Sequence, residues 1–270
     1  MLNYQKITQN YSLNNEKGGF VTTISASLSI SIASLLLKSP FSFKGVFTMK
    51  GMVNVFGSLD IKDRYNMTII KVEQNELKTY KPIGMAYVML RNASFESTNI
   101  TLTKKNACVN TGENFTISCG ENSSACIVEF PGLSLLESRI FIQECLDIGN
   151  LSYMDGGTNT TAINPGRLGD PVINYVHFPA GMYQTLHTHP SHRVGLVIKG
   201  NGKIELDNKE FYNINEGEVF FMRRNCLHNF ICEDEDVIVF VWSPDSGTGP
   251  TDEVNPLKIR TYVGQQRYHR

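Results

Sequence analysis

The 270-residue sequence lacks the features that would mark it as a nucleic-acid or membrane protein. Its 25 basic and 26 acidic side chains leave a net charge of −1, so charge gives no reason to expect nucleic acid or an anionic membrane as a partner. The stretch from Phe20 to Leu37 contains too many hydroxyl side chains for a membrane span. Its partial alternation predicts a strand instead, with a short helix from Ile32 to Lys38 as the alternative.

Closely spaced cysteine pairs are also lacking, and the N-terminal residues give no reason to expect a leader. The six cysteines form no C-x2-C pair and no zinc-finger spacing, and the polar segment from Met1 to Gly19 does not resemble a signal peptide. A reduced, cytoplasmic location is therefore the default expectation. Eight N-x-S/T sequons keep a secreted location open, although a chain rich in Asn, Ser and Thr is the simpler explanation. They begin at Asn10, Asn66, Asn92, Asn99, Asn114, Asn122, Asn150 and Asn159.

Histidine is absent before His177, but three later histidines have a spacing suited to a metal ion. His187 and His189 stand at i and i+2 in a run that predicts β structure, so their side chains share one face of a strand. His228 follows a hydrophobic strand, Val219 to Met222, that can return beside the first. Three imidazoles that converge on one point form a site for one divalent transition metal.

The segment that carries these histidines resembles the two motifs of the cupin superfamily. The matching positions are Gly181, His187, His189 and Gly200 in the first motif, and Gly217 and His228 in the second. Four positions depart from the family pattern: Arg193 replaces the usual metal-binding Glu, and Arg223, Asn225 and Cys232 replace the Pro, Gly and Asn of the second motif. The resemblance extends from Val172 to roughly Asp245, and it implies a metal-binding β-barrel.

The region from Phe43 to Glu129 contains short strands separated by turn residues. Their order resembles a second cupin half whose histidine positions are empty. We therefore expect an all-β protein with two cupin-type (jelly-roll) β-barrels in tandem, a bicupin. The expected parts are an N-terminal segment (1–43), a degenerate barrel without metal ligands (44–131), a connector (132–171), a metal-binding barrel (172–245) and a C-terminal tail (246–270).

The connector is long enough that part of it is expected to cover the barrel mouth. Its segment from Leu133 to Leu146 is compatible with a helix or with one strand and a turn.

Residues around the histidines are candidates for further roles. Alternation places Tyr183 and Thr185 on the face of His187 and His189, so both should line the cavity, and Tyr183 is a candidate catalytic residue. Arg193, the second catalytic candidate, is either a surface residue or a cation directed into the barrel. A substrate carboxylate would then offset the charges of the guanidinium and the metal. His192 is a candidate extra ligand, and His177 is expected to be structural.

Three neutral imidazoles can bind Fe(II), Mn(II), Ni(II), Cu(II) or Zn(II), and affinity alone does not choose among them. The resemblance places Fe(II) first, because three-histidine cupin sites are found in dioxygenases. The expected function is therefore an Fe(II)-dependent dioxygenase acting on a small anionic substrate. An oxygen-independent isomerase or lyase and a non-catalytic ligand-binding cupin are the alternatives, and a homodimer is an open possibility.

Overall fold

The computed structural model describes residues 51–63, 65–131, 133, 137–144, 147–167, 169–207, 209–245, 261–263 and 266–268. The chain divides into two compact units, Met1–Ser42 and Phe43–Arg270, and all described residues lie in the second. The strand or helix expected between Phe20 and Lys38 lies outside the described residues. Within them, the structure is β-strands and one 3₁₀ turn, η1 (Met154–Gly156), and it contains no helix that could cross a membrane.

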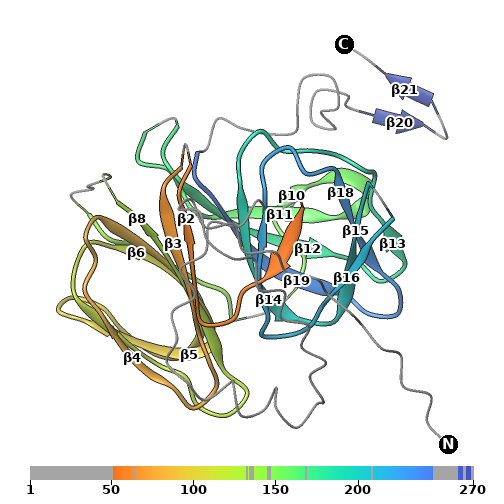
Figure 1. Cartoon of the computed structure of the whole chain (residues 1–270). Helices are drawn as coiled ribbons and strands as arrows, with labels where there is room; N and C mark the ends of the chain where they lie inside the picture. Colours follow the sequence, from red (N-terminus) through yellow and green to blue (C-terminus); the bar gives the residue numbers. More distant parts are fainter. Residues whose placement is uncertain are drawn as a thin grey trace, which may run out of the picture. The chain divides into compact units, whose positions relative to one another are not determined.

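The first half is a sheet that folds over on itself (Figure 1). Its strand order is β2-β3-β8-β5-β6-β9, and β7 pairs with both β4 and β5. Residues 85–91 of β5 pair with β8, whereas residues 94–97 pair with β7, so the long strand β5 belongs to both layers. The strands are β2 (Ser58–Ile61), β3 (Met67–Val72), β4 (Leu77–Tyr80), β5 (Met85–Ser97), β6 (Thr101–Thr111), β7 (Phe115–Ser118), β8 (Ser124–Phe130) and β9 (Arg139–Ile142).

The second half consists of a seven-stranded and a four-stranded sheet. The larger sheet has the order β1 (Met52–Asn54), β17 (Val219–Met222), β14 (Arg193–Lys199), β19 (Val237–Ser243), β12 (Val172–Phe178), β11 (Thr158–Ile163) and β10 (Leu151–Ser152). The smaller sheet has the order β13 (Met182–Tyr183), β18 (His228–Cys232), β15 (Gly202–Leu206) and β16 (Phe211–Ile214). A separate hairpin pairs β20 (Thr261–Val263) with β21 (Gln266–Tyr268).

Alternation along the strands divides the apolar residues between two cores. In β12, Val176 and Phe178 belong to the core between the two sheets of the second half. Ile173 and Tyr175, which point the other way, belong to a cluster that also contains Tyr87 of the first half. The two halves of this unit therefore share one hydrophobic core.

The expected all-β architecture with two barrel-like halves is confirmed, but strands cross the expected boundaries. Met52–Asn54, expected in the first barrel, pairs instead with β17 of the second half. The connector segment is not a helix where it is described: Arg139–Ile142 extends the sheet of the first half, and β10 and β11 extend that of the second. Each exchange gives a sheet edge a hydrogen-bonded partner, which is the physical reason for the shifted boundaries.

Candidate metal centre

Two of the three histidines lie opposite one another on neighbouring chain segments. The backbone N–H of His187 donates to the carbonyl of His228 at 2.9 Å, and the N–H of His228 donates back to His187 at 3.0 Å. Such a doubly hydrogen-bonded antiparallel pair holds the two Cα atoms about 5.5 Å apart. The ring centroids of His187 and His228 lie 4.4 Å apart. The backbone pairing therefore determines the spacing of His187 and His228.

The third histidine, His189, lies in the loop that follows. Its carbonyl accepts a hydrogen bond of 2.6 Å from the N–H of Asn225, so the loop after β17 holds it in place. Asn225 has φ 58, the left-handed conformation that Asn tolerates better than most residues. One ligand nitrogen from each of the three histidines lies within 4.8 Å of the others.

The chemistry of the three rings fits a metal ion. Nδ1–H of His187 donates to the carbonyl of Thr185 and Nδ1–H of His228 donates to that of Cys226, both at 2.9 Å. Because the proton of each ring is therefore on Nδ1, Nε2 carries the lone pair that can bind a metal. Burial lowers the pKa of His187 to about 4 and the pKa of His189 and His228 well below the usual value. At neutral pH all three are therefore uncharged, the form that binds a metal.

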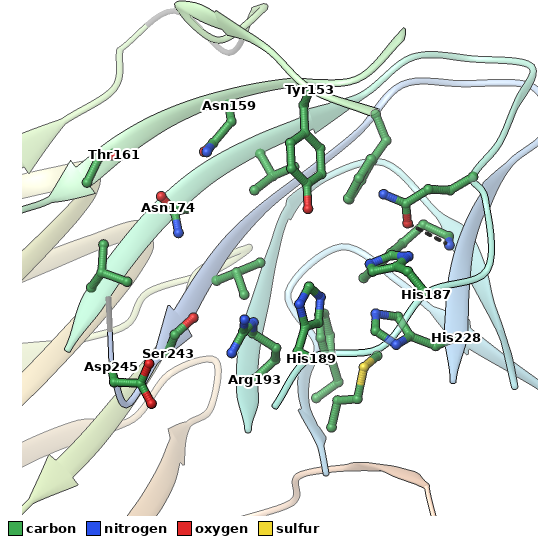
Figure 2. A pocket seen from close by; sticks show the side chains of 18 of the residues that line it. Tyr153, Asn159, Thr161, Asn174, His187, His189, Arg193, His228, Ser243 and Asp245 are labelled. Carbon is green, nitrogen blue, oxygen red and sulfur yellow. Dashed lines mark hydrogen bonds between the residues drawn. The ribbon is translucent and has the colours of Figure 1, made fainter. Parts of the chain in front are cut away.

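The histidines line a cavity of about 360 Å³ between the two sheets (Figure 2). This volume lies at the lower end of the range of small-molecule sites. The apolar lining consists of Pro165, Val172, Val176, Phe178, Phe220, Met222, Phe230 and Val241. The polar lining, besides the histidines, consists of Tyr153, Asn159, Thr161, Asn164, Asn174, Gln184, Arg193, Ser243 and Asp245.

Comparison with known families gives one sequence match, to the family described as cupin domain, at residues 174–244. The matched region contains all three histidines. Residues 174–244 are a cupin domain. No curated protein matches the sequence.

Solved structures with a similar fold have low sequence identity to this chain. A protein of unknown function from Pseudomonas syringae pv. tomato is 14% identical, with a TM-score of 0.50 over 70% of this chain and 85% of that one. A cupin 2 conserved barrel protein from Leptotrichia buccalis is 17% identical, with a TM-score of 0.48 over 77% and 97%. A salicylate 1,2-dioxygenase from Pseudaminobacter salicylatoxidans is 11% identical, with a TM-score of 0.47 over 69% and 74%. At such identities the likeness concerns the fold alone.

Arg193, which replaces the usual Glu of the cupin motif, lines the cavity and is only 7% exposed. Its Nη1 donates to the Ser191 hydroxyl at 2.6 Å and to the carbonyl of His192 at 2.9 Å. Burial lowers the pKa of Arg193 to about 10, so the guanidinium still carries a positive charge at neutral pH. Of the two orientations that the sequence left open, the structure has the inward one.

Tyr183 does not line the cavity, and the prediction that it does is wrong. Its side chain is 61% exposed, and its hydroxyl donates to Glu205 on the outer side of the four-stranded sheet. Thr185 is also absent from the lining and bonds to Asp155 instead. The reason is that β13 ends at Tyr183, so strict alternation does not continue to His187. Gln184 lines the cavity in place of its two neighbours.

His192 is not an extra ligand in this geometry, because both of its nitrogens are engaged elsewhere. Nδ1 accepts the N–H of Arg224 at 2.9 Å, so the ring proton is on Nε2 and is donated to Asp63 of the first half at 2.8 Å. His177, expected to be structural, lies outside the cavity lining with Nε2 3.2 Å from a carboxylate oxygen of Asp236.

The sequence did not point to Tyr153, which the connector places in the cavity wall. Its hydroxyl is directed into the cavity above the histidines (Figure 2) and makes no hydrogen bond to any residue that the structure describes. Burial raises the pKa of Tyr153 to about 12, so the phenol keeps its proton at neutral pH. Two residues later, Asp155 accepts the N–H of Thr185 at 2.6 Å and thereby ties the connector to the strand that leads to His187.

Proposed function

We propose that this cupin is a metal-dependent enzyme: an Fe(II) dioxygenase with His187, His189 and His228 as ligands that acts on a small anionic organic substrate. The observation that carries the proposal is the convergence of three buried, uncharged imidazoles on a cavity that also contains a buried guanidinium. A three-nitrogen site leaves positions open for substrate and dioxygen and supplies, with iron bound, the redox chemistry of an oxygenase.

Arg193 supports the anionic character of the substrate. A buried guanidinium beside a divalent cation is destabilised by repulsion unless an anion lies near both. Carboxylate is the group that a guanidinium binds best, through paired charge-assisted hydrogen bonds. The aliphatic and aromatic walls exclude water from the remainder of the substrate, which strengthens this attraction.

A second candidate is an oxygen-independent isomerase or lyase, and one observation favours it. Tyr153 places a protonated hydroxyl in the cavity without a hydrogen-bond partner among the described residues. A phenol in this state can donate a proton to a substrate atom, or hold the proton that such a reaction moves.

Oxygen uptake separates these functions. Protein loaded with Fe(II) is mixed with small carboxylates, including salicylate and oxalate, in an oxygen electrode, with Zn(II)-loaded protein as the control. The dioxygenase proposal expects substrate-dependent uptake only with iron, and none in the His187→Ala/His189→Ala variant, which should also lose its bound metal. Metal-dependent turnover without oxygen would instead establish the second candidate. Ligand binding without turnover under either condition would establish a binding module and refute both enzymes.

Arg193 is tested separately through ligand affinity. Arg193→Lys keeps the charge but loses the paired hydrogen bonds, which should weaken carboxylate binding by roughly 1–3 kcal/mol. Arg193→Gln should weaken it further while metal content stays unchanged. The matched control is Lys199→Gln, which removes a charge from the exposed end of the same strand, β14. Unchanged carboxylate affinity in both Arg193 variants would contradict the assigned role.

A further inference from the structure

A group of uncharged polar side chains lines the cavity on the side away from His187 and His228. Asn159 and Thr161 belong to β11 and Asn174 to β12, and Figure 2 shows the three together, with Arg193 lying between them and His187 and His228. Thr161 is paired directly with Asn174 across the two strands. We call Asn159, Thr161 and Asn174 the amide wall.

The strand register explains why these side chains face the cavity. Asn159 pairs with Val176 and Thr161 with Asn174, and the two β12 residues alternate with Ile173 and Tyr175, which face the shared core. On its other side, β12 pairs Asn174 with Val241 of β19, another cavity residue. The amide wall is therefore an inward-facing row on a rigid sheet.

One atom of the amide wall lacks a partner. The side-chain oxygen Oδ1 of Asn159 is buried and makes no hydrogen bond to any residue that the structure describes. A buried acceptor left without a donor costs free energy, which a ligand hydroxyl or N–H would recover. Across the strand pair, Asn159 is opposite Val176, whose aliphatic side chain offers no donor. The missing donor is therefore one that a ligand can provide.

The amide wall carries no formal charge, which restricts the ligand group that fits it. An ammonium or a second carboxylate would be desolvated there without a counter-ion, whereas a hydroxyl or an amide N–H only exchanges hydrogen bonds with water for hydrogen bonds with the wall. Beyond the amide wall, Arg193 and then the histidine cluster suit an anion. The two ends of the cavity thus favour different groups.

We propose that Asn159, Thr161 and Asn174 form a specificity subsite that selects organic acids carrying an uncharged hydrogen-bond donor, a hydroxyl or an N–H, at the end remote from the acid group. The inference rests on the proposed function in one respect, because it places the acid group at the metal and Arg193. It adds the substrate class: hydroxy acids and amide-bearing acids rather than plain hydrocarbon acids or diacids.

The test compares matched probes on metal-loaded protein. Calorimetric affinities are measured for ω-hydroxycarboxylates of increasing chain length and for the unsubstituted carboxylates of equal length, with Zn(II) bound so that no oxidation occurs. At one chain length the hydroxy acid should bind about tenfold more tightly than its plain counterpart. In Asn159→Leu and Asn174→Leu this preference should vanish while the affinity for the plain acid remains. Asn213→Leu, an exposed substitution on β16 outside the cavity, is the matched control.

The outcomes separate the subsite from the proposed function. Plain acids that bind in a metal-dependent way, with no hydroxyl preference at any length, would overturn the subsite alone. A hydroxyl preference that is unchanged in both Leu variants would also overturn it. A preference that needs the amide wall, with affinities for both acids that are unchanged in metal-free protein, would support the subsite and refute the anion site at the metal. If no acid of either series binds, both proposals are refuted.

Discussion

The three histidines of the candidate metal centre differ in how their rings are held. His187 and His228 each donate Nδ1–H to a carbonyl two residues earlier, which fixes the ring and its tautomer. Nδ1 of His189 is buried and has no hydrogen-bond partner among the described residues. The orientation of His189 therefore depends on packing and on the loop that carries it. Substitutions that alter this loop should affect metal affinity more than substitutions elsewhere in the second half.

Burial of neutral His187 predicts a pH-dependent stability for the metal-free protein. An unfolded histidine gains a proton near pH 6.5, whereas folded His187, with a pKa of about 4, stays neutral. Between these values the unfolded chain binds more protons, so stability falls as the pH is lowered. For His187 alone the loss from pH 7 to pH 5 should be roughly 2 kcal/mol.

Urea unfolding of the metal-free parent and of His187→Gln at both pH values checks this prediction. The parent should lose more stability than the variant over this interval. Equal losses would show that His187 does not remain neutral in the folded protein.

Tyr153 should matter for turnover and not for metal binding. Tyr153→Phe removes only the hydroxyl that faces the cavity. If this hydroxyl moves a proton, kcat should fall by about 100-fold or more, with metal content unchanged. Steady-state kinetics on any substrate found by the oxygen or anaerobic assays would measure this. Tyr183→Phe, outside the cavity, is the control and should behave as the parent; the reverse pattern would restore the sequence-based choice of Tyr183.

At the scale of elements, the turn between β2 and β3 reaches from the first half to the loops around the candidate metal centre. Asp63 accepts the Nε2 proton of His192, and Tyr65 donates its hydroxyl to Asp245 of the cavity lining at 2.9 Å. His192 in turn accepts the N–H of Arg224. His192 thus joins the loop that carries His189 to the loop that precedes His228, and Asp63 ties both loops to the first half.

Removal of this link should weaken metal binding. Asp63→Ala leaves His192 without its carboxylate partner, and the loop that carries His189 loses one support. The expected loss of metal affinity is about tenfold, the lower end of the range for residues that orient ligands from a distance. Competition with a chromophoric chelator measures it.

The control for that experiment lies three residues earlier. Asp60→Ala removes an exposed carboxylate whose hydrogen-bond partner, in the part of the chain that the structure describes, is the Thr68 hydroxyl of the first half. Equal metal affinities for Asp63→Ala and Asp60→Ala would show that the link does not support the site.

The strands and loops differ in how well the sequence predicts them. Several strands of both halves and the histidine cluster could be predicted from local spacing, because alternation and motif intervals act over a few residues. The prediction that Tyr183 faces the cavity was wrong because side chains alternate between faces only while the chain stays in a strand. Tyr153 and Asp63 were beyond prediction, since they approach the site through pairing of distant segments. Asn174 could have been recognised from the sequence as a cavity residue, because it is an amide within the otherwise apolar start of β12.

At the scale of the molecule, the halves are joined by buried side chains and by polar bridges. Trp242 of β19 is fully buried, with its ring 6.1 Å from that of Tyr87 and 5.8 Å from that of Phe130. Arg91 of β5 donates to the carbonyl of Ile198 at 3.2 Å and pairs with Glu216. An interface with a continuous apolar core behaves as the interior of one domain, and independent folding of either half is not expected.

Trp242 allows this to be tested without a label, because it is the only tryptophan in the sequence. In urea, its fluorescence should change at the same concentration as the far-ultraviolet circular dichroism of the strands, in one transition. Tyr87→Ala should shift both signals together to lower urea, since it leaves a cavity beside the indole. A fluorescence change that precedes the loss of β signal would mean that the halves separate before they unfold.

The placement of β1 has a consequence for how the chain is made. Met52 pairs with Met222, so the strand that is synthesised early acquires its partner only after 170 further residues have been added. At ribosomal rates of about 5–20 residues per second, this takes on the order of ten seconds or more. Throughout that interval an apolar segment with unsatisfied backbone groups is exposed to other chains. Completion of the seven-stranded sheet is therefore a late event in synthesis, and the nascent protein should depend on chaperones until β17 has emerged.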